Sequence, residues 1–162
     1  MKSLVTVMAT FVLGAAAALL LSAATQSLDS SEAQPIERDL WEFACATLHD
    51  TCEDITPPRV LRLDLYSTQG IYGGYEPSRP WTAYLLIDSY ILPQLGRVLY
   101  NSVVIHEAVH YIDNARGRLD LTNPCGSESR GWAAGNAYLI SMGRVDMVDD
   151  KWSERYGCQP TA

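Results

Sequence analysis

The alternation of hydrophobic and polar positions predicts one helix and two strands in the first half of the folded chain. Apolar residues recur at helical spacing over residues 36–48, with a proline before them and acidic residues in the first turn. Residues 61–65 alternate with period two, and residues 81–87 are rich in aromatic and branched side chains, so both segments are predicted strands. We expect these strands to pair, either as a hairpin or across a longer loop. The glycines between them, Gly70, Gly73 and Gly74, predict a turn.

The second half of the chain is predicted to be helical. Pro93 and Gly96 interrupt the pattern after the second strand, and apolar positions at helical spacing then predict helices over 98–115 and 127–142. A short polar helix is expected before Cys158. The fold class is therefore α+β, with three or four helices and a small sheet.

The N-terminal segment has the layout of an export signal. Leu4 to Ala24 contains no charge and no proline, follows Lys2, and ends in small residues. We expect cleavage before Thr25, although the segment is also nearly long enough to remain as an uncleaved membrane anchor. The predicted organisation is a signal peptide or anchor (1–24), a linker (25–35) and one folded domain (36–162), exported to a periplasmic or secreted location.

The charge balance restricts the class of partner. The 162 residues carry a formal net charge of −7, and no run of lysine or arginine interrupts the acidic background. Such a chain is not expected to bind nucleic acid or anionic lipid through surface charge, because both partners require basic patches. Contact with a membrane is therefore expected only through the N-terminal segment, if that segment is not cleaved.

Four cysteines follow the export segment: Cys45, Cys52, Cys125 and Cys158. An even number of cysteines in an exported chain predicts two disulfides, and three pairings are possible. We favour the pairing of Cys45 with Cys52, which closes a short loop after a helix, and of Cys125 with Cys158, which fixes the C-terminal tail. A cysteine zinc site is the alternative, but the chain contains no Cys-x-x-Cys pair.

Residues 106–110 read His-Glu-Ala-Val-His, an HExxH motif within the predicted 98–115 helix. Histidines four positions apart lie one above the other on a helix, so both imidazoles can bind one zinc ion at about 2.0–2.1 Å. Glu107 lies beside them and can take a proton from a zinc-bound water and pass it to a leaving amine. The motif therefore predicts one catalytic Zn²⁺, with His106 and His110 as ligands and Glu107 as the acid/base.

A catalytic zinc usually has three protein ligands, so a third ligand is needed. Glu128 is the leading candidate because it opens the next helix, where Gly131 and Gly135 would permit close packing against the motif helix. Asp113 is the alternative, one turn beyond His110. We expect Asp113 instead to accept a hydrogen bond from a ligand imidazole and fix its tautomer.

A longer pattern surrounds the motif: His106-Glu107-x-x-His110-x-x-Asp113-x-x-Arg116, then Asp120, then Ser127-Glu128-x-Arg130, with Gly73-Gly74-Tyr75 upstream. This pattern resembles the mitochondrial intermembrane-space metalloproteases that process and help assemble an ATP synthase subunit, together with their short bacterial and phage relatives. The resemblance implies a minimal zincin-like domain of the gluzincin type. It also implies that His106, His110 and Glu128 bind zinc and that Glu107 is the catalytic acid/base.

The sequence thus predicts zinc-dependent hydrolysis of a peptide or protein substrate by a small exported metallopeptidase. An edge of the small sheet could hold an extended substrate by strand addition. Tyr138, Arg130 and His49 are candidate oxyanion donors, although packing or surface roles are more common for such residues. The alternative function is a non-catalytic zinc-binding envelope scaffold, or an interaction module with a protease-like fold.

Overall fold

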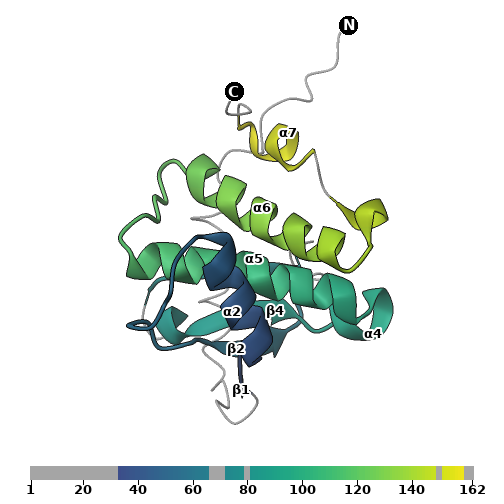
Figure 1. Ribbon diagram of the computed structural model, residues 1–162, viewed down its shortest axis with the longest axis horizontal. Coiled ribbons are helices and arrows are strands. Elements are labelled where there is room, and N and C mark those ends of the chain that lie inside the picture. The colour runs from purple at the N-terminus through teal and green to yellow at the C-terminus, as the bar shows by residue number, and fades with distance from the viewer. Residues whose placement is uncertain (1–32, 66–71, 79–80, 149–150, 159–162) are drawn as a thin grey trace, which may run out of the picture.

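The computed structural model describes residues 33–65, 72–78, 81–148 and 151–158, and their fold belongs to the α+β class, as predicted (Figure 1). The strands are β1 (Gln34–Pro35), β2 (Arg59–Leu63), β3 (Gly73–Tyr75) and β4 (Tyr84–Asp88). The α-helices are α2 (Arg38–Thr47), α4 (Ile91–Leu95), α5 (Arg97–Ala115), α6 (Cys125–Ser141) and α7 (Trp152–Tyr156). Short 3₁₀ turns occupy Trp81–Ala83 and Val145–Met147. The predicted export segment lies outside the described residues.

The strands form one mixed sheet in the order β1-β2-β4-β3. The two predicted strands pair, but in parallel, with Val60 opposite Leu85, so they do not form a hairpin. Gly73 and Gly74, predicted as a turn, instead lie in β3 and pair antiparallel with β4. Because parallel neighbours need a long connection, the chain between β2 and β4 has room to supply this edge strand. β1 uses the last two residues of the predicted linker to form the opposite edge.

The predicted long helices are confirmed to within about two residues at each end, and α7 is the predicted short polar helix. Within the described ranges, the one α-helix that was not predicted is α4, which contains Pro93 where the sequence predicts an interruption. Pro93 is the third residue of α4, and a proline is tolerated in the first helical turn because the N–H groups there have no intrahelical acceptor. Gly96, at φ 87°, then separates α4 from α5.

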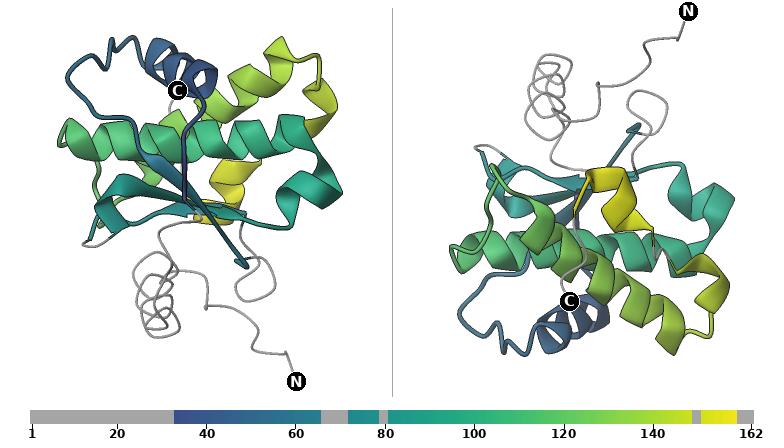
Figure 2. Two further views of the ribbon diagram at one scale, coloured as in Figure 1. Left: turned by 90° about the horizontal axis from the view of Figure 1, so that it is seen from below. Right: turned by 90° about the horizontal axis from the view of Figure 1, so that it is seen from above.

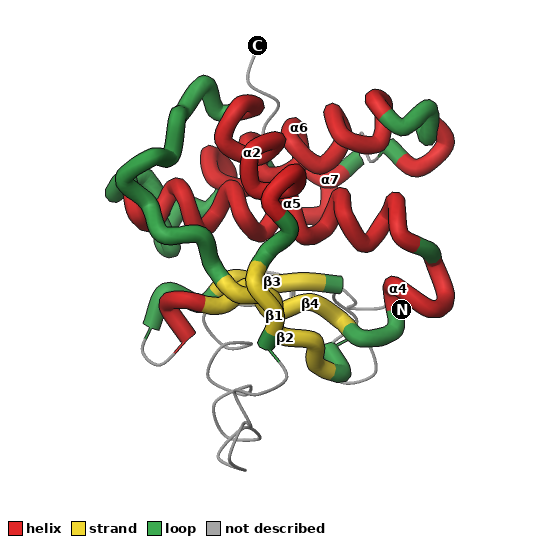
Figure 3. The backbone as a smooth tube through the Cα atoms, turned by 60° about the horizontal axis from the view of Figure 1, so that its bottom comes forward, coloured by secondary structure: helices red, strands yellow, loops and turns green. Residues whose placement is uncertain are grey.

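Helix α5 lies at the centre of the molecule, between the sheet and a layer formed by α2 and α6 (Figures 2 and 3). Its apolar side chains join the main core, in which Val104, Ile105 and Ile112 are almost completely buried with Leu85 and Ile87 of β4. Because α5 is surrounded on several sides, even its polar side chains are removed from solvent. The HExxH motif is therefore placed in the interior rather than on an exposed helix face.

The four cysteines form the two favoured disulfides, Cys45–Cys52 and Cys125–Cys158. The first closes the loop after α2, and the second joins Cys125 at the start of α6 to Cys158, two residues after the end of α7. Two disulfides indicate an oxidising compartment. Among the described residues, no helix has both the length and the hydropathy needed to cross a bilayer.

Candidate metal centre

Three potential metal ligands converge between α5 and α6. His106 and His110 lie one turn apart on α5, and Glu128 lies in the first turn of α6; all three side chains are buried. The two Nε2 atoms are 3.0 Å apart, and the Glu128 carboxylate oxygens lie 3.4 Å from His106 Nε2 and 3.5 Å from His110 Nε2. The sequence-predicted ligands are therefore brought together by helix packing.

The spacing of these atoms suits a metal ion. Ligands at about 2.0–2.1 Å in tetrahedral geometry are about 3.3 Å from one another, close to the three separations observed. Glu128 Oε2 is buried and, within the described part of the chain, its 3.4 Å contact with His106 Nε2 does not have hydrogen-bond geometry, as expected for an atom in a metal-binding group. This buried group of two imidazoles and one carboxylate could bind a metal ion.

Two glycines of α6 allow the helices to approach this closely, as predicted. A Cβ atom at Gly131 would lie 2.9–3.1 Å from three ring atoms of His106. A Cβ atom at Gly135 would lie 3.1 Å from the carbonyl oxygen of Ser102 on α5. Any side chain at these positions would push α6, and with it Glu128, away from the histidines.

The imidazole of His110 is oriented by a serine that sequence reasoning missed. Ser127 Oγ lies 2.7 Å from His110 Nδ1 and 3.1 Å from Asp113 Oδ2. Since a carboxylate can only accept, the serine donates to Asp113 and accepts from Nδ1–H, which leaves the His110 Nε2 lone pair facing Glu128. Asp113 therefore acts on the imidazole through Ser127 rather than directly. The only sequence signal for Ser127 is its place beside Glu128 at the helix start.

Asp113 is completely buried and lies outside the group of converging ligands. Its carboxylate accepts hydrogen bonds from Arg118 Nε at 3.0 Å and from Arg130 Nε and Nη2 at 2.8 and 2.6 Å. Arg130 is thus paired with Asp113 rather than placed as an oxyanion donor. Of the other two candidate donors, Tyr138 accepts a hydrogen bond from Asn101 at 2.8 Å, and His49 is exposed in the loop after α2.

Glu107 is buried against strand β3. A Cβ atom at Gly73 would lie 2.9 Å from Glu107 Oε1 and 2.7 Å from Val103 Cγ1. The β3 backbone therefore packs against Glu107 with no space for a side chain between them. A side chain on residue 73 would displace the carboxylate. A glycine before an apolar strand is a known signal of close backbone approach, and this signal could have placed Gly73 at the site.

Burial and the charges of neighbouring groups together set the ionisation of the site. Burial raises the pKa of Glu107 to about 7, and burial together with the charge of His106 lowers the pKa of His110 to about 4. Burial also acts to raise the pKa of Glu128, but the neighbouring imidazoles of His106 and His110 outweigh it, and that pKa is lowered. At neutral pH the site therefore offers a neutral His110 imidazole and an ionised Glu128 carboxylate, which are the forms that bind metals.

Trp132 forms one wall of the site and was not anticipated from the sequence. Its half-buried ring meets the His106 ring edge to face, with centroids 4.9 Å apart at 74°. Trp132 lies four residues after Glu128 on α6, so both side chains project from the same helix face. The spacing of four residues between Glu128 and Trp132 was the sequence signal that could have placed Trp132 at the site.

In comparisons with protein-family models, curated proteins and solved structures, nothing matches the chain. The resemblance to the mitochondrial metalloproteases therefore stays a prediction that rests on the motif residues. The candidate metal centre therefore rests on the geometry of His106, His110 and Glu128.

Proposed function

We propose that this protein is a zinc-dependent peptidase in which Glu107 is the catalytic acid/base. The observation that carries the proposal is the convergence of the two motif histidines and Glu128, at separations suited to zinc, with Glu107 from the same motif beside them. Zinc favours a tetrahedral set of nitrogen and oxygen ligands, and three protein ligands leave one position open.

A bound zinc ion would polarise a substrate carbonyl and lower the pKa of a water molecule toward neutrality. Glu107 would serve as the group that takes up a proton during the attack and delivers it to the amine nitrogen that leaves. Both transfers need a group whose pKa lies near the working pH, and burial supplies this to Glu107. Ser127, hydrogen-bonded to Asp113, accepts from Nδ1–H of His110, so the neutral imidazole presents its Nε2 lone pair to a metal.

The position of β3 supports a peptide as the substrate. β3 is the terminal strand of the described sheet, and its Gly73 backbone touches Glu107. An extended peptide that pairs with a terminal strand is held by main-chain hydrogen bonds. Because main-chain hydrogen bonds do not depend on the substrate's side chains, peptides of different sequence would place their scissile bond close to Glu107.

The number of candidate metal ligands distinguishes a catalytic site from the alternative function, a non-catalytic zinc-binding scaffold. A structural zinc site is usually closed by four protein ligands. The described residues bring together three candidate ligands, and the nearby Asp113 is occupied by two arginines and a serine. An open site of three ligands favours catalysis.

The test is to measure zinc content by elemental analysis and cleavage of a random peptide library, for the full chain with both disulfides formed. Glu107→Gln is expected to keep one zinc per chain and to lose about 100- to 10,000-fold in rate. Glu42→Gln, which changes an exposed carboxylate paired with Arg38, is the matched control and should cleave like the parent. Zinc without cleavage in the parent would favour the scaffold, and absence of zinc would refute the proposal.

A further inference from the structure

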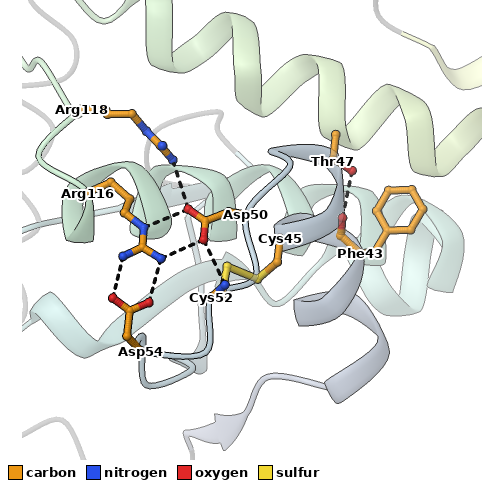
Figure 4. Close-up of a disulfide and its surroundings, with 8 residues drawn as sticks. All are labelled: Phe43, Cys45, Thr47, Asp50, Cys52, Asp54, Arg116 and Arg118. Carbon is orange, nitrogen blue, oxygen red and sulfur yellow. Dashed lines mark hydrogen bonds and ion pairs between the residues drawn. A yellow bond between two sulfur atoms is a disulfide. The ribbon is translucent and has the colours of Figure 1, made fainter.

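Six charged side chains form a continuous row of ion pairs that runs from the loop after α2 to Asp113, which accepts a hydrogen bond from the Ser127 partner of His110. They alternate in sign: Asp54, Arg116, Asp50, Arg118, Asp113 and Arg130. Arg116 binds Asp54 at 2.7 Å and Asp50 at 2.8 Å; Arg118 lies 4.0 Å from Asp50 and 3.0 Å from Asp113. Figure 4 shows the part that surrounds Asp50. Because it contains three carboxylates and three guanidinium groups, this row of six side chains has no net charge.

Asp50 is held in place by the loop that the Cys45–Cys52 disulfide closes (Figure 4). Its backbone N–H donates to the carbonyl of Cys45 at 2.9 Å, and its Oδ1 accepts from the backbone N–H of Cys52 at 3.0 Å. His49 and Cys52, on either side, both have φ of 53°, in the left-handed region that side chains disfavour. Such a loop keeps this conformation only while the surrounding contacts hold it.

Arg118 connects this loop to the metal centre. Its guanidinium lies between Asp50 and Asp113, and Asp113 accepts from the Ser127 hydroxyl that orients His110. Without Asp50, the remaining charges would sum to +1 beside a site for a cation. Arg118 would also lose one of the two carboxylates that fix its position. Both effects weaken metal binding, and neither requires Asp50 to touch a ligand.

We propose that Asp50 is a positioning residue for the metal ligand His110, acting through Arg118, Asp113 and Ser127, and that the Cys45–Cys52 disulfide holds it in place. The proposal rests on the metal centre of the proposed function and is independent of which reaction the centre performs. Asp54 provides a built-in comparison, because it binds the same Arg116 but makes no contact with Arg118 among the interactions of the described residues.

The test compares Asp50→Asn with Asp54→Asn in the full chain, with zinc affinity measured by competition with a chelator. Removal of a group hydrogen-bonded to a metal ligand costs roughly 10- to 100-fold in affinity, so we expect about 3- to 10-fold for the more distant Asp50. Asp54→Asn should stay within about twofold, since the Asp54 side chain is 69% exposed and solvent screens its charge. Asp50→Glu should recover part of the loss. Equal affinities for Asp50→Asn and Asp54→Asn would overturn the proposal.

The role of the disulfide is tested by a cycle that combines Cys45→Ser/Cys52→Ser with Asp50→Asn. If the disulfide acts through Asp50, the two losses of zinc affinity are not additive; additive losses would refute that part.

Nitrogen-15 NMR of the imidazoles gives a readout in metal-free protein. Asp50→Asn should shift the Nδ1–H signal of His110, and Asp54→Asn should not. A parent that binds no zinc would refute the proposed function, while this signal would still decide the role of Asp50.

Discussion

The apolar and the ionisable side chains of α5 are buried to nearly the same extent, with opposite consequences. Val104, Ile105 and Ile112 have 0–1% of their surface exposed, whereas His106 and Asp113 have 9% and 0%. Burial of an apolar side chain of this size stabilises the fold by about 1.5–3 kcal/mol. Burial of an ionisable group opposes its charged form, and the raised pKa of Glu107 is one result. The same helix therefore stabilises the domain with its apolar set, Val104, Ile105 and Ile112, and forms the candidate metal centre with its polar set, His106, Glu107, His110 and Asp113.

The difference between the two sets shows why the polar set needs so many partners. Asp113 is compensated by two arginines and a serine, His110 by Ser127 and Glu128, and His106 by Glu128. An ionisable group taken out of water is stable only with such partners. The apolar set needs shape alone, so each set should respond to substitution in its own way.

The largest expected effect follows removal of a ligand. Zinc binding free energies of about 10–16 kcal/mol shared by four ligands assign roughly 2.5–4 kcal/mol to one, so Glu128→Gln should weaken zinc by about 60- to 700-fold. Asp113→Asn should weaken zinc less, by roughly 10- to 100-fold, because it acts through Ser127. Chelator competition measures both. If Asp113→Asn proved the more damaging, Asp113 would have to replace Glu128 as the third ligand.

A substitution in the apolar set should change stability without changing metal binding. Ile105 is completely buried, and Ile105→Ala should lower the free energy of unfolding by about 3 kcal/mol, within the range for such truncations. The loss should be equal in metal-free and zinc-loaded protein, as measured by urea unfolding. Ile105→Val, as the milder control, should lose about 1 kcal/mol. A larger loss in the zinc-loaded protein would mean that the two sets are coupled.

Sequence periodicity predicted the helices and the three residues that converge as a candidate metal site, because both depend on local spacing. The i,i+4 histidines share a face on any helix, and Glu128 was the first carboxylate of the next helix. The disulfide pairing followed from short loops and the position of the tail. These features need little knowledge of the tertiary fold.

The features that sequence reasoning missed depend on contacts between distant segments. Gly73-Gly74 has the local signature of a turn, but pairing with β4 and contact with Glu107 make it a strand. The parallel pairing of β2 with β4 cannot be distinguished from a hairpin by alternation alone. Ser127 gained its role only when α6 packed on α5 with the right rotation. Tertiary packing thus decided what local patterns left open.

A smaller effect is expected at Gly131, where α6 packs directly against the His106 ring of α5. Gly131→Ala would place a methyl group against the His106 ring, and overpacking of this kind costs about 1–3 kcal/mol. We expect lower stability together with weaker zinc binding, because α6 must move away with Glu128. Gly126→Ala in the same helix is the matched control, since its methyl group would meet only the end of Arg130 at 3.7 Å. Thermal unfolding and chelator competition measure the pair. Zinc affinity unchanged in Gly131→Ala would show that the helix spacing is not critical for the ligands.

The smallest expected effect concerns Asp50, whose side chain lies outside α5 and is 13% exposed. Hydrogen bonds from Arg116 and from the Cys52 backbone hold the pKa of Asp50 well below its usual range. An unfolded chain protonates this carboxyl near pH 4. Its stabilising contribution is therefore present above about pH 4 and disappears as the pH falls toward the lowered folded pKa.

Asp50→Asn should accordingly be less stable than the parent at pH 7 by about 1 kcal/mol or less, as for an ion pair at the surface. This difference should shrink as the pH falls below about 4, because the parent then loses the contribution that the variant already lacks. Urea unfolding from pH 7 to pH 2, with chelator present to remove metal, measures the two curves. The Ile105→Ala deficit should not change with pH through Asp50, since an apolar side chain does not titrate. A difference between Asp50→Asn and the parent that stayed constant to pH 2 would show that Asp50 stabilises the loop by shape alone, like the apolar set, rather than by its charge.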